Sequence, residues 1–279
     1  MSSYSIADSL GCMTMTGVVR ASLRATLEMA LPTTCGGCGE SGATWCAVCA
    51  HETGQVTYPG GPRQVCPTPC PVGYPPTWAA TPYDAAVRVA LVAFKDSDRR
   101  DLKRVLAPML AAALDAALAT DPRFRAVLTS GNGPVFVVPV PSSPSAVRRR
   151  GDAPLELLTR AAVVQTARSE CELIVSPALR LRRRVADQAG LNHRQRASNL
   201  ERAMQVRPRW QTSIHGVTCL LTDDVLTTGA TLVEAARALR AAGADHVAAA
   251  TVAATQRRGI PVAGGAHRED LRSRSAGGA

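Results

Sequence analysis

The side chains best suited to chemistry are concentrated in one uninterrupted run: Asp223, Asp224, Val225, Leu226, Thr227, Thr228, Gly229, Ala230 and Thr231. An apolar segment precedes the two acids, and a loop of threonines and a glycine then leads into a helical pattern. Free amides at the start of a helix carry partial positive charge, a glycine lets a ligand approach the backbone, and threonine hydroxyls add hydrogen-bond donors. The loop 227–231 therefore suits a bound phosphate group.

The acid pair needs a different role, because two carboxylates repel a phosphate. Asp223 and Asp224 suit sugar hydroxyls or a magnesium ion beside the phosphate, and we treat both as candidate catalytic residues. Other phosphate-binding signatures are absent, since the chain has neither a glycine-rich loop ending in Gly-Lys-Ser/Thr nor a G-x-G-x-x-G motif after a predicted strand. The alternative interpretation is structural, with the threonines capping a helix and the acids on the surface.

A second group with a recognisable spacing consists of two Cys-x-x-Cys pairs separated by seven residues: Cys35, Cys38, Cys46 and Cys49. Glycines around the first pair permit tight turns that aim two thiolates at one ion. Such pairs are typical of a structural Zn²⁺ site, which is closed by four protein ligands and supports folding rather than catalysis. A redox pair and a set of metal-free thiols are the alternatives.

The other cysteines carry less information. Nine cysteines in a chain without an export signal argue against a disulfide framework. Cys66 and Cys70 lie in a proline-rich stretch with no Cys-x-x-Cys pair nearby, so we expect them to be ordinary thiols. Cys219 lies in an apolar strand pattern and is expected to be a small buried hydrophobe.

The positive charge of the chain is concentrated in one region. The formal net charge is +10, and 30 of the 32 basic residues are arginine. Fourteen arginines and only six acids lie within residues 141–210. Arginine presents a planar fork of donors that suits phosphate oxygens, so this region favours a polyanionic ligand. The alternative is a set of solvated arginines on the surface.

Short apolar runs rich in β-branched residues predict the elements that position these groups. Residues 135–140, 217–222 and 247–252 are predicted to be buried strands of a mainly parallel sheet. A helical pattern over about 231–242 ends at a glycine and completes a βαβ unit. Apolar residues over 102–118 recur at the spacing of one helix face. The predicted fold class is therefore α/β, with a doubly wound, mainly parallel sheet flanked by helices.

Composition divides the chain into five parts. We expect a flexible N-terminus with a short helix over about 18–31, and then the four-cysteine module. The next stretch has too many prolines and glycines for regular structure and is expected to be a linker or a lid. The main α/β domain follows, and the Gly-, Arg- and Ser-rich end is expected to be disordered. The corresponding ranges are 1–30, 31–52, 53–82, 83–258 and 259–279.

Neither the N-terminus nor the apolar runs indicate export or membrane insertion. Arg20, Arg24 and Glu28 interrupt the apolar stretch near the N-terminus. No apolar run reaches the roughly 18 residues that are needed to span a bilayer. We therefore expect a cytoplasmic protein without membrane insertion.

Together these features resemble the ComF family of phosphoribosyltransferase-like proteins, in which a short zinc-binding segment precedes a type I phosphoribosyltransferase domain. The run 223–231 is similar to the signature with which such domains bind 5-phosphoribosyl 1-pyrophosphate (PRPP). The resemblance also includes Tyr83 with Lys95, the strand end 138–141 before Arg149-Arg150-Gly151, and the segment from Gln188 through Arg196 to Leu200. The chain departs from the family at Asp152-Ala153-Pro154, where an aromatic residue, an asparagine and a glutamine are usual.

The resemblance implies a type I phosphoribosyltransferase-like fold that binds PRPP together with Mg²⁺. The 5′-phosphate would lie in the loop 227–231, and the ribose hydroxyls would contact Asp223 and Asp224. Departure of pyrophosphate leaves an oxocarbenium-like ribosyl centre, so catalysis needs cations on the leaving group and carboxylates near the developing positive charge. The candidate cations for pyrophosphate are Lys95, Arg148, Arg149, Arg150 and Arg196.

Two function classes remain open. In the first, the chain transfers a phosphoribosyl group to an unidentified acceptor and releases pyrophosphate. In the second, it is a non-catalytic accessory protein of DNA uptake in natural competence, which binds PRPP and single-stranded DNA and contacts competence-machinery proteins. Only 4% of the residues are aromatic. This disfavours the second class, because proteins that bind single strands usually stack the bases on aromatic side chains.

Overall fold

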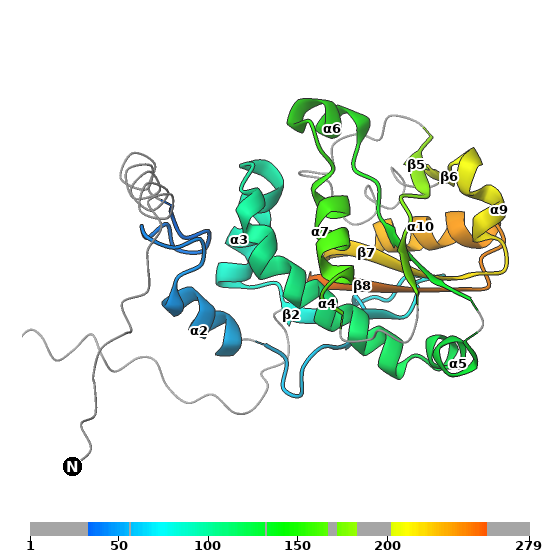
Figure 1. Ribbon diagram of the computed structural model, residues 1–279, viewed down its shortest axis with the longest axis horizontal. Coiled ribbons are helices and arrows are strands. Elements are labelled where there is room, and N and C mark those ends of the chain that lie inside the picture. Colours follow the sequence, from blue (N-terminus) through cyan, green and yellow to red (C-terminus); the bar gives the residue numbers. More distant parts are fainter. Residues whose placement is uncertain (1–32, 56, 132, 167–171, 183–201, 256–279) are drawn as a thin grey trace, which may run out of the picture.

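The computed structural model describes residues 33–55, 57–131, 133–166, 172–182 and 202–255 of the 279-residue chain (Figure 1). The expected helix over 18–31, the segment from Gln188 to Leu200 with Arg196, and the tail 259–279 lie outside these residues.

A six-stranded sheet forms the centre of the fold, with the strand order β1-β2-β8-β7-β3-β4. All neighbouring strands are parallel except β1, which pairs antiparallel with β2 at the edge. The strand bounds are β1 Arg63–Val65, β2 Thr77–Pro82, β3 Val135–Pro139, β4 Leu173–Val175, β7 Thr218–Leu226 and β8 His246–Ala254. The mainly parallel α/β sheet expected from the sequence is thus confirmed.

Two apolar cores cover the two faces of this sheet. One core contains Leu220 and is closed by helices α3, α4, α5 and α7. The other contains Leu221 and is closed by α10 together with the two-stranded sheet of β5 and β6 and the short helix α9. Because successive side chains of a strand point to opposite faces, a strand buried on both faces needs an unbroken apolar run. The helix bounds are α3 Ala85–Asp96, α4 Lys103–Thr120, α5 Pro122–Ser130, α7 Pro154–Val163, α9 Gln211–Ile214 and α10 Ala230–Ala241.

The remaining described elements are short. The second sheet pairs β5 Leu179–Leu181 antiparallel with β6 Met204–Val206. Helix α2 Ala47–Gln55 begins directly after Cys46 and contains Cys49, and α6 Pro144–Arg150 follows β3. The two 3₁₀ turns are η1 Arg100–Leu102 and η2 Pro208–Trp210. None of the described helices combines the length and the apolar character that a membrane crossing requires.

The sheet brings two loops together at the carboxyl ends of neighbouring strands. Strands β3 and β7 are adjacent and parallel, with Pro139 opposite Thr222. The chain after β3 leads to α6 and to α7, which packs on one face, whereas the chain after β7 enters α10 on the other face. In doubly wound sheets, loops that leave adjacent strands toward opposite faces open a crevice that binds ligands.

The expectation that residues 53–82 lack regular structure is wrong. Residues 77–82 form strand β2 beside β8, and Trp78 and Ala79 pack into the two cores. Cys66 and Cys70 are joined by a disulfide, with their Cα atoms 5.8 Å apart, and are not the ordinary thiols that we expected. Apart from Gly54 in α2 and Pro82 at the last position of β2, the prolines and glycines of this segment lie in the loops around β1 and β2, where breakers are tolerated.

Strand β7 is longer than the sequence predicts. The apolar run ends at Thr222, but the ladder with β8 continues through Asp223 opposite Thr251 and ends with Leu226 opposite Ala254. The acid pair is therefore held by sheet hydrogen bonding rather than by the loop. The predicted end of β7 came from the end of the apolar run, whereas main-chain pairing with β8 determines where the strand actually ends.

Candidate active site

The loop 227–229 joins the end of β7 to the start of α10 and presents the first turn of that helix. Gly229 occupies the N-cap position in the left-handed conformation, with φ of 77°. The first main-chain bond of the helix runs from the Val233 N–H to the Gly229 carbonyl at 2.9 Å. Thr228 Oγ1 accepts a hydrogen bond from the Ala230 N–H at 3.4 Å. The amides that precede Val233 have no carbonyl partner within the helix and form a cradle for an anion.

The acid pair lies at the end of β7, immediately before this cradle. Asp223 Oδ1 accepts a hydrogen bond from the Asp224 N–H at 2.9 Å. Burial and the nearby charge of Asp224 raise the pKa of Asp223 well above its usual value. Burial acts to raise the pKa of Asp224 as well, but the charge and hydrogen bond of Lys95 hold it below its usual value. A cation or a hydrogen-bond donor at this point would stabilise the second carboxylate.

Lys95 is brought to the acid pair from the C-terminal end of α3. Its Nζ lies 2.8 Å from Asp224 Oδ2. Burial acts to lower the pKa of Lys95, but the charge of Asp224 outweighs burial and raises it. The next residue, Asp96, accepts a hydrogen bond from Arg150 of α6 at 2.6 Å. The end of α3 thus connects the acid pair to the arginine helix across the crevice between β3 and β7.

Helix α6 carries three consecutive arginines in its last turn. Arg150 is half-buried and paired with Asp96, whereas Arg148 and Arg149 are exposed and form no ion pair with an acid in the described part of the chain. The helix ends at Gly151, and the carboxylate of the following Asp152 accepts two hydrogen bonds from Arg100, at 2.6 and 2.8 Å. Asp152 therefore anchors the turn after the arginines.

The structure brings together most of the residues singled out from the sequence. Asp223 and Asp224 in β7 are separated from the segment 227–231 by two residues, Lys95 contacts Asp224, and Arg150 reaches the same helix end as Lys95. Arg149 lies on the same helix as Arg150 with its side chain exposed. Arg196 lies outside the described residues.

The residues that cover Gly229 in the loop 227–229, the candidate phosphate loop, could not be identified from the sequence pattern. The loop between β1 and β2 places Pro67 and Tyr74 against Gly229, where a Cβ atom would lie 3.1 and 2.9 Å from them. Arg240 of α10 donates a hydrogen bond to the Gly73 carbonyl at 2.9 Å and so anchors this loop to the helix. Burial raises the pKa of Tyr74. Two tyrosines and two closely spaced cysteines in this proline-rich segment were the signal that could have predicted an ordered loop here.

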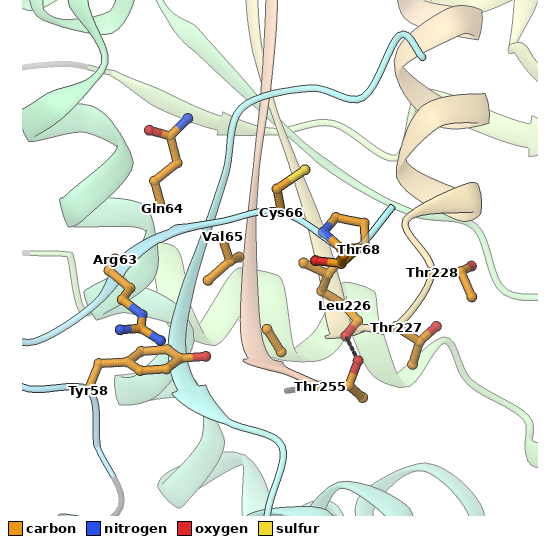
Figure 2. A pocket seen from close by; sticks show the side chains of 12 residues that line it. Tyr58, Arg63, Gln64, Val65, Cys66, Thr68, Leu226, Thr227, Thr228 and Thr255 are labelled. Atoms are coloured by element: carbon orange, nitrogen blue, oxygen red, sulfur yellow. Dashed lines mark hydrogen bonds between the residues drawn. The ribbon is translucent and has the colours of Figure 1, made fainter. Parts of the chain in front are cut away.

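A cleft of about 610 Å³ opens beside the phosphate loop (Figure 2). One wall comes from residues 58 and 63–68, and the other from the ends of β7 and β8. Its lining includes the side chains of Thr227 and Thr228, so the cleft and the loop share residues. Its size is that of a site for a small molecule.

The four cysteines of the N-terminal module converge as their spacing predicts. Their Sγ atoms all lie within 4.8 Å of one another, and those of Cys38 and Cys46 are 3.6 Å apart. Four thiolates bound to one Zn²⁺ at about 2.3 Å have sulfurs roughly 3.8 Å apart, so the cluster fits this ion. A Cβ atom at Gly37 would lie 2.6 Å from the Cys49 Sγ, which explains the glycine there.

The acid-base properties of the cluster also favour a cation. Burial acts to raise the pKa of Cys35, but hydrogen bonds from the amides of Cys38, Cys46 and Gly37 lower it to about 6. Burial and the neighbouring cysteines raise the pKa of Cys49. A first thiolate thus forms readily and opposes a second one, unless a metal ion offsets their repulsion.

Comparison with protein families gives one finding on this site. The family model for the phosphoribosyl transferase domain matches residues 178–269, about a third of the chain. The matched region includes the acid pair, the phosphate loop, α10 and β8. It supports a phosphoribosyltransferase-like protein. No curated protein sequence matches the chain.

Proposed function

We propose that the chain is a PRPP-dependent phosphoribosyltransferase that transfers the phosphoribosyl group to an acceptor and releases pyrophosphate. One observation carries the proposal: Asp223 and Asp224 lie near the end of β7, with four residues between them and Gly229, the N-cap of α10, at the crevice of the sheet and inside the region matched by the family model. In a parallel sheet this is the place where a sugar phosphate binds.

The loop 227–231 would hold the 5′-phosphate. Its amides supply donors, and the hydroxyls of Thr227, Thr228 and Thr231 add three more without adding charge. Asp223 and Asp224 would accept hydrogen bonds from the ribose hydroxyls. The two carboxylates also suit Mg²⁺, because it prefers oxygen ligands and because a divalent cation would offset both the burial and the charge of Asp224 that raise the pKa of Asp223. Bound with PRPP, Mg²⁺ would neutralise negative charge on the phosphates.

Charge explains how these residues would lower the barrier. As the C1–O bond of the ribose breaks, its electron pair leaves with pyrophosphate and positive charge develops on the ribosyl ring. The carboxylates of Asp223 and Asp224 stabilise that positive charge. Lys95, Arg149 and Arg150 would bind the departing pyrophosphate, and Lys95 would leave Asp224 to do so. The acceptor then donates an electron pair to C1.

We further propose that the chain has the organisation of the ComF family. Its support is the four-cysteine cluster ahead of a phosphoribosyltransferase-like sheet. The division into a zinc-binding module at 31–52 and a catalytic domain extending to 258 belongs to this proposal. In it the zinc is structural, because all four positions around the metal are taken by cysteines.

The acid pair provides the direct test. The variant carrying Asp223→Asn and Asp224→Asn should bind PRPP in the presence of Mg²⁺ roughly tenfold or more weakly, because the amides keep the size but lose the charge. Asp245→Asn, in an exposed turn before β8, is the matched control and should leave the affinity unchanged. Calorimetry that shows equal affinity in a well-folded double variant would remove the proposed role of the acids.

A second function, single-stranded DNA binding in natural competence, is favoured within the described residues by the exposed Arg148 and Arg149 of α6. If Arg149 and Arg150 serve pyrophosphate, replacing both with Ala should weaken PRPP binding and leave oligonucleotide binding unchanged. If they contact DNA, the slope of log K against log salt should become shallower by about 1.4. The second result, with PRPP affinity intact, would favour the accessory role.

A further inference from the structure

The cleft beside the phosphate loop has a chemical character of its own, which the proposed function does not use. Figure 2 shows Arg63 and Tyr58 at one end and Thr227 and Thr228 at the other. The cleft does not include Gly229, Ala230 or Thr231, whose amides form the phosphate cradle. It therefore adjoins the proposed PRPP site and shares Thr227 and Thr228 with it. It is lined by residues 58, 63–68, 226–228, 254 and 255.

Arg63 provides the only charge among these lining residues, none of which is acidic. Its guanidinium carbon lies 4.0 Å from the centroid of the Tyr58 ring. Tyr58 is buried, so the arginine rests on a fixed surface. Within the described residues Arg63 forms no ion pair with a carboxylate. The ring thus positions the guanidinium without neutralising it.

An arginine in this situation favours an anionic ligand. A cation–π contact leaves the edge donors of the guanidinium available, and these donors match the two oxygens of a carboxylate. The hydroxyl of Thr68 adds a neutral hydrogen-bonding group, and that of Thr255, which donates to the Leu226 carbonyl at 3.2 Å, can accept a hydrogen bond. Val65, Pro67 and Leu226 supply apolar surface to the body of a ligand. The lining thus combines one positive charge, several hydroxyls and an apolar wall.

We propose that this cleft is the acceptor site and that the acceptor is a small organic acid whose carboxylate pairs with Arg63. The proposal rests on the proposed phosphoribosyl transfer, which requires an acceptor beside the bound PRPP. A nucleophilic atom elsewhere on the acid forms the new bond to C1 while the C1–O bond breaks and pyrophosphate leaves with its electron pair. Any proton on the attacking atom passes to water.

The test uses pairs of probes that differ only in the acid group. Nicotinate with nicotinamide, and orotate with uracil, are titrated by calorimetry into the full-length protein saturated with PRPP and Mg²⁺. The acid of at least one pair should bind roughly tenfold or more tightly than its neutral partner, because the acid alone forms a charged hydrogen-bonded pair with Arg63. Equal or absent binding of both members of every pair would overturn the acceptor assignment.

Arg63→Gln should abolish the preference for the acid, Arg63→Lys should retain part of it, and PRPP affinity should be unchanged in both. Arg209→Gln, at another exposed arginine, is the matched control and should keep the preference. Weaker PRPP binding by Arg63→Gln would overturn the assignment, because Arg63 would then serve a phosphate of PRPP. Failure of the unaltered protein to bind PRPP would instead refute the proposed function itself, and the acceptor site with it. The melting temperature of each variant reports whether it is folded.

Discussion

At the scale of single residues, the candidate site depends on a glycine, Gly229, at a position where a side chain would be strained. Gly229 combines a left-handed conformation with a close neighbour, since an added Cβ would lie 2.9 Å from the Tyr74 ring. Gly60 is also left-handed, with φ of 83°, but an added Cβ there would meet nothing within 4 Å. The two glycines therefore separate the effect of conformation from the effect of contact.

Gly229→Ala should lower the free energy of unfolding by more than Gly60→Ala does. The conformational cost, about 1–2 kcal/mol, applies to both, whereas only the first must also displace Tyr74 or Pro67. Gly229→Ala should also weaken PRPP binding, because the helix start moves. Chemical denaturation and calorimetry on both variants measure these effects. Equal losses of stability in the two variants would show that the contacts of Tyr74 and Pro67 with Gly229 do not contribute to stability.

Asp152 shows how one charged pair should report on pH. The hydrogen bonds of Arg100, which outweigh burial, lower the pKa of Asp152. A carboxyl whose pKa is lower in the folded state contributes stability above its ordinary pKa and loses it as the pH falls through the folded value. This contribution is therefore complete at neutral pH and disappears in acid.

Asp152→Asn should lower the free energy of unfolding by about 1 kcal/mol at pH 7, as expected for a half-exposed pair of good geometry. The difference from the unaltered protein should begin to shrink below about pH 4, where the unfolded chain takes up a proton, and should vanish only once the pH falls through the lower folded pKa. Urea denaturation between pH 3 and pH 7 measures it, with Asp245→Asn as the control. A difference that is constant with pH would mean that Arg100 does not act through charge.

At the scale of elements, the segment between α2 and β2 is part of the site and not a tether. Its disulfide closes a small loop that includes Pro67, one of the residues in contact with Gly229. The same segment provides Tyr58 and Arg63 to the cleft. The order of this loop should therefore influence both stability and ligand binding.

Replacing Cys66 and Cys70 with Ala should lower the free energy of unfolding by about 2 kcal/mol in the chain-entropy treatment of so short a loop. PRPP affinity should fall as well, because Pro67 is released from Gly229. Reduction of the disulfide in the unaltered protein should also lower the free energy of unfolding and the PRPP affinity. The control variant Cys219→Ala, which keeps the disulfide, should respond to reductant in the same way. Two free thiols at Cys66 and Cys70 in the purified protein, by thiol titration and mass spectrometry, would contradict the disulfide.

At the scale of the whole molecule, the cysteine module is connected to the main sheet by packing. Leu102 of η1 lies so close to Gly36 that an added Cβ would come within 2.5 Å of it. Arg99 donates a hydrogen bond to the Thr34 carbonyl at 2.7 Å, and Ala86 of α3 packs with Cys35 and Cys49. Helix α3 also carries Lys95, so the order of the module should influence the site through this helix.

The purified protein should contain about one zinc ion per chain, bound by the four cysteines. Cys35→Ser and Cys46→Ser should lose the metal and melt at a lower temperature, because metal binding contributes to folding. Cys219→Ala, at a buried cysteine outside the cluster, should keep the full metal content. Metal analysis by mass spectrometry and thermal melts decide the question. Unchanged zinc and melting in both serine variants would refute the assignment.

Much of this architecture is determined by local patterns in the sequence. The strands β3, β7 and β8 and the helix α10 follow from short apolar runs and helical spacing, since each must bury its apolar residues. The convergence of the four cysteines follows from their spacing, because a Cys-x-x-Cys pair already places two sulfurs on one side of a turn. The position of the loop 227–229 is predicted by Gly229, which lies between the strand pattern and the helical pattern.

Tertiary structure alone decided what lies around those elements. The pairing of Lys95 with Asp224 joins residues 129 positions apart, and no local pattern specifies it. The placement of Pro67, Tyr74 and Arg63 beside the phosphate loop depends on β2 entering the sheet next to β8. The sequence pattern did not predict strand β2, because the prolines and glycines around it are typical of loops. The six residues that pair with β8 are too few to change the composition of the whole segment. Local sequence determines which elements form, whereas the pairing of distant strands determines which side chains share a site.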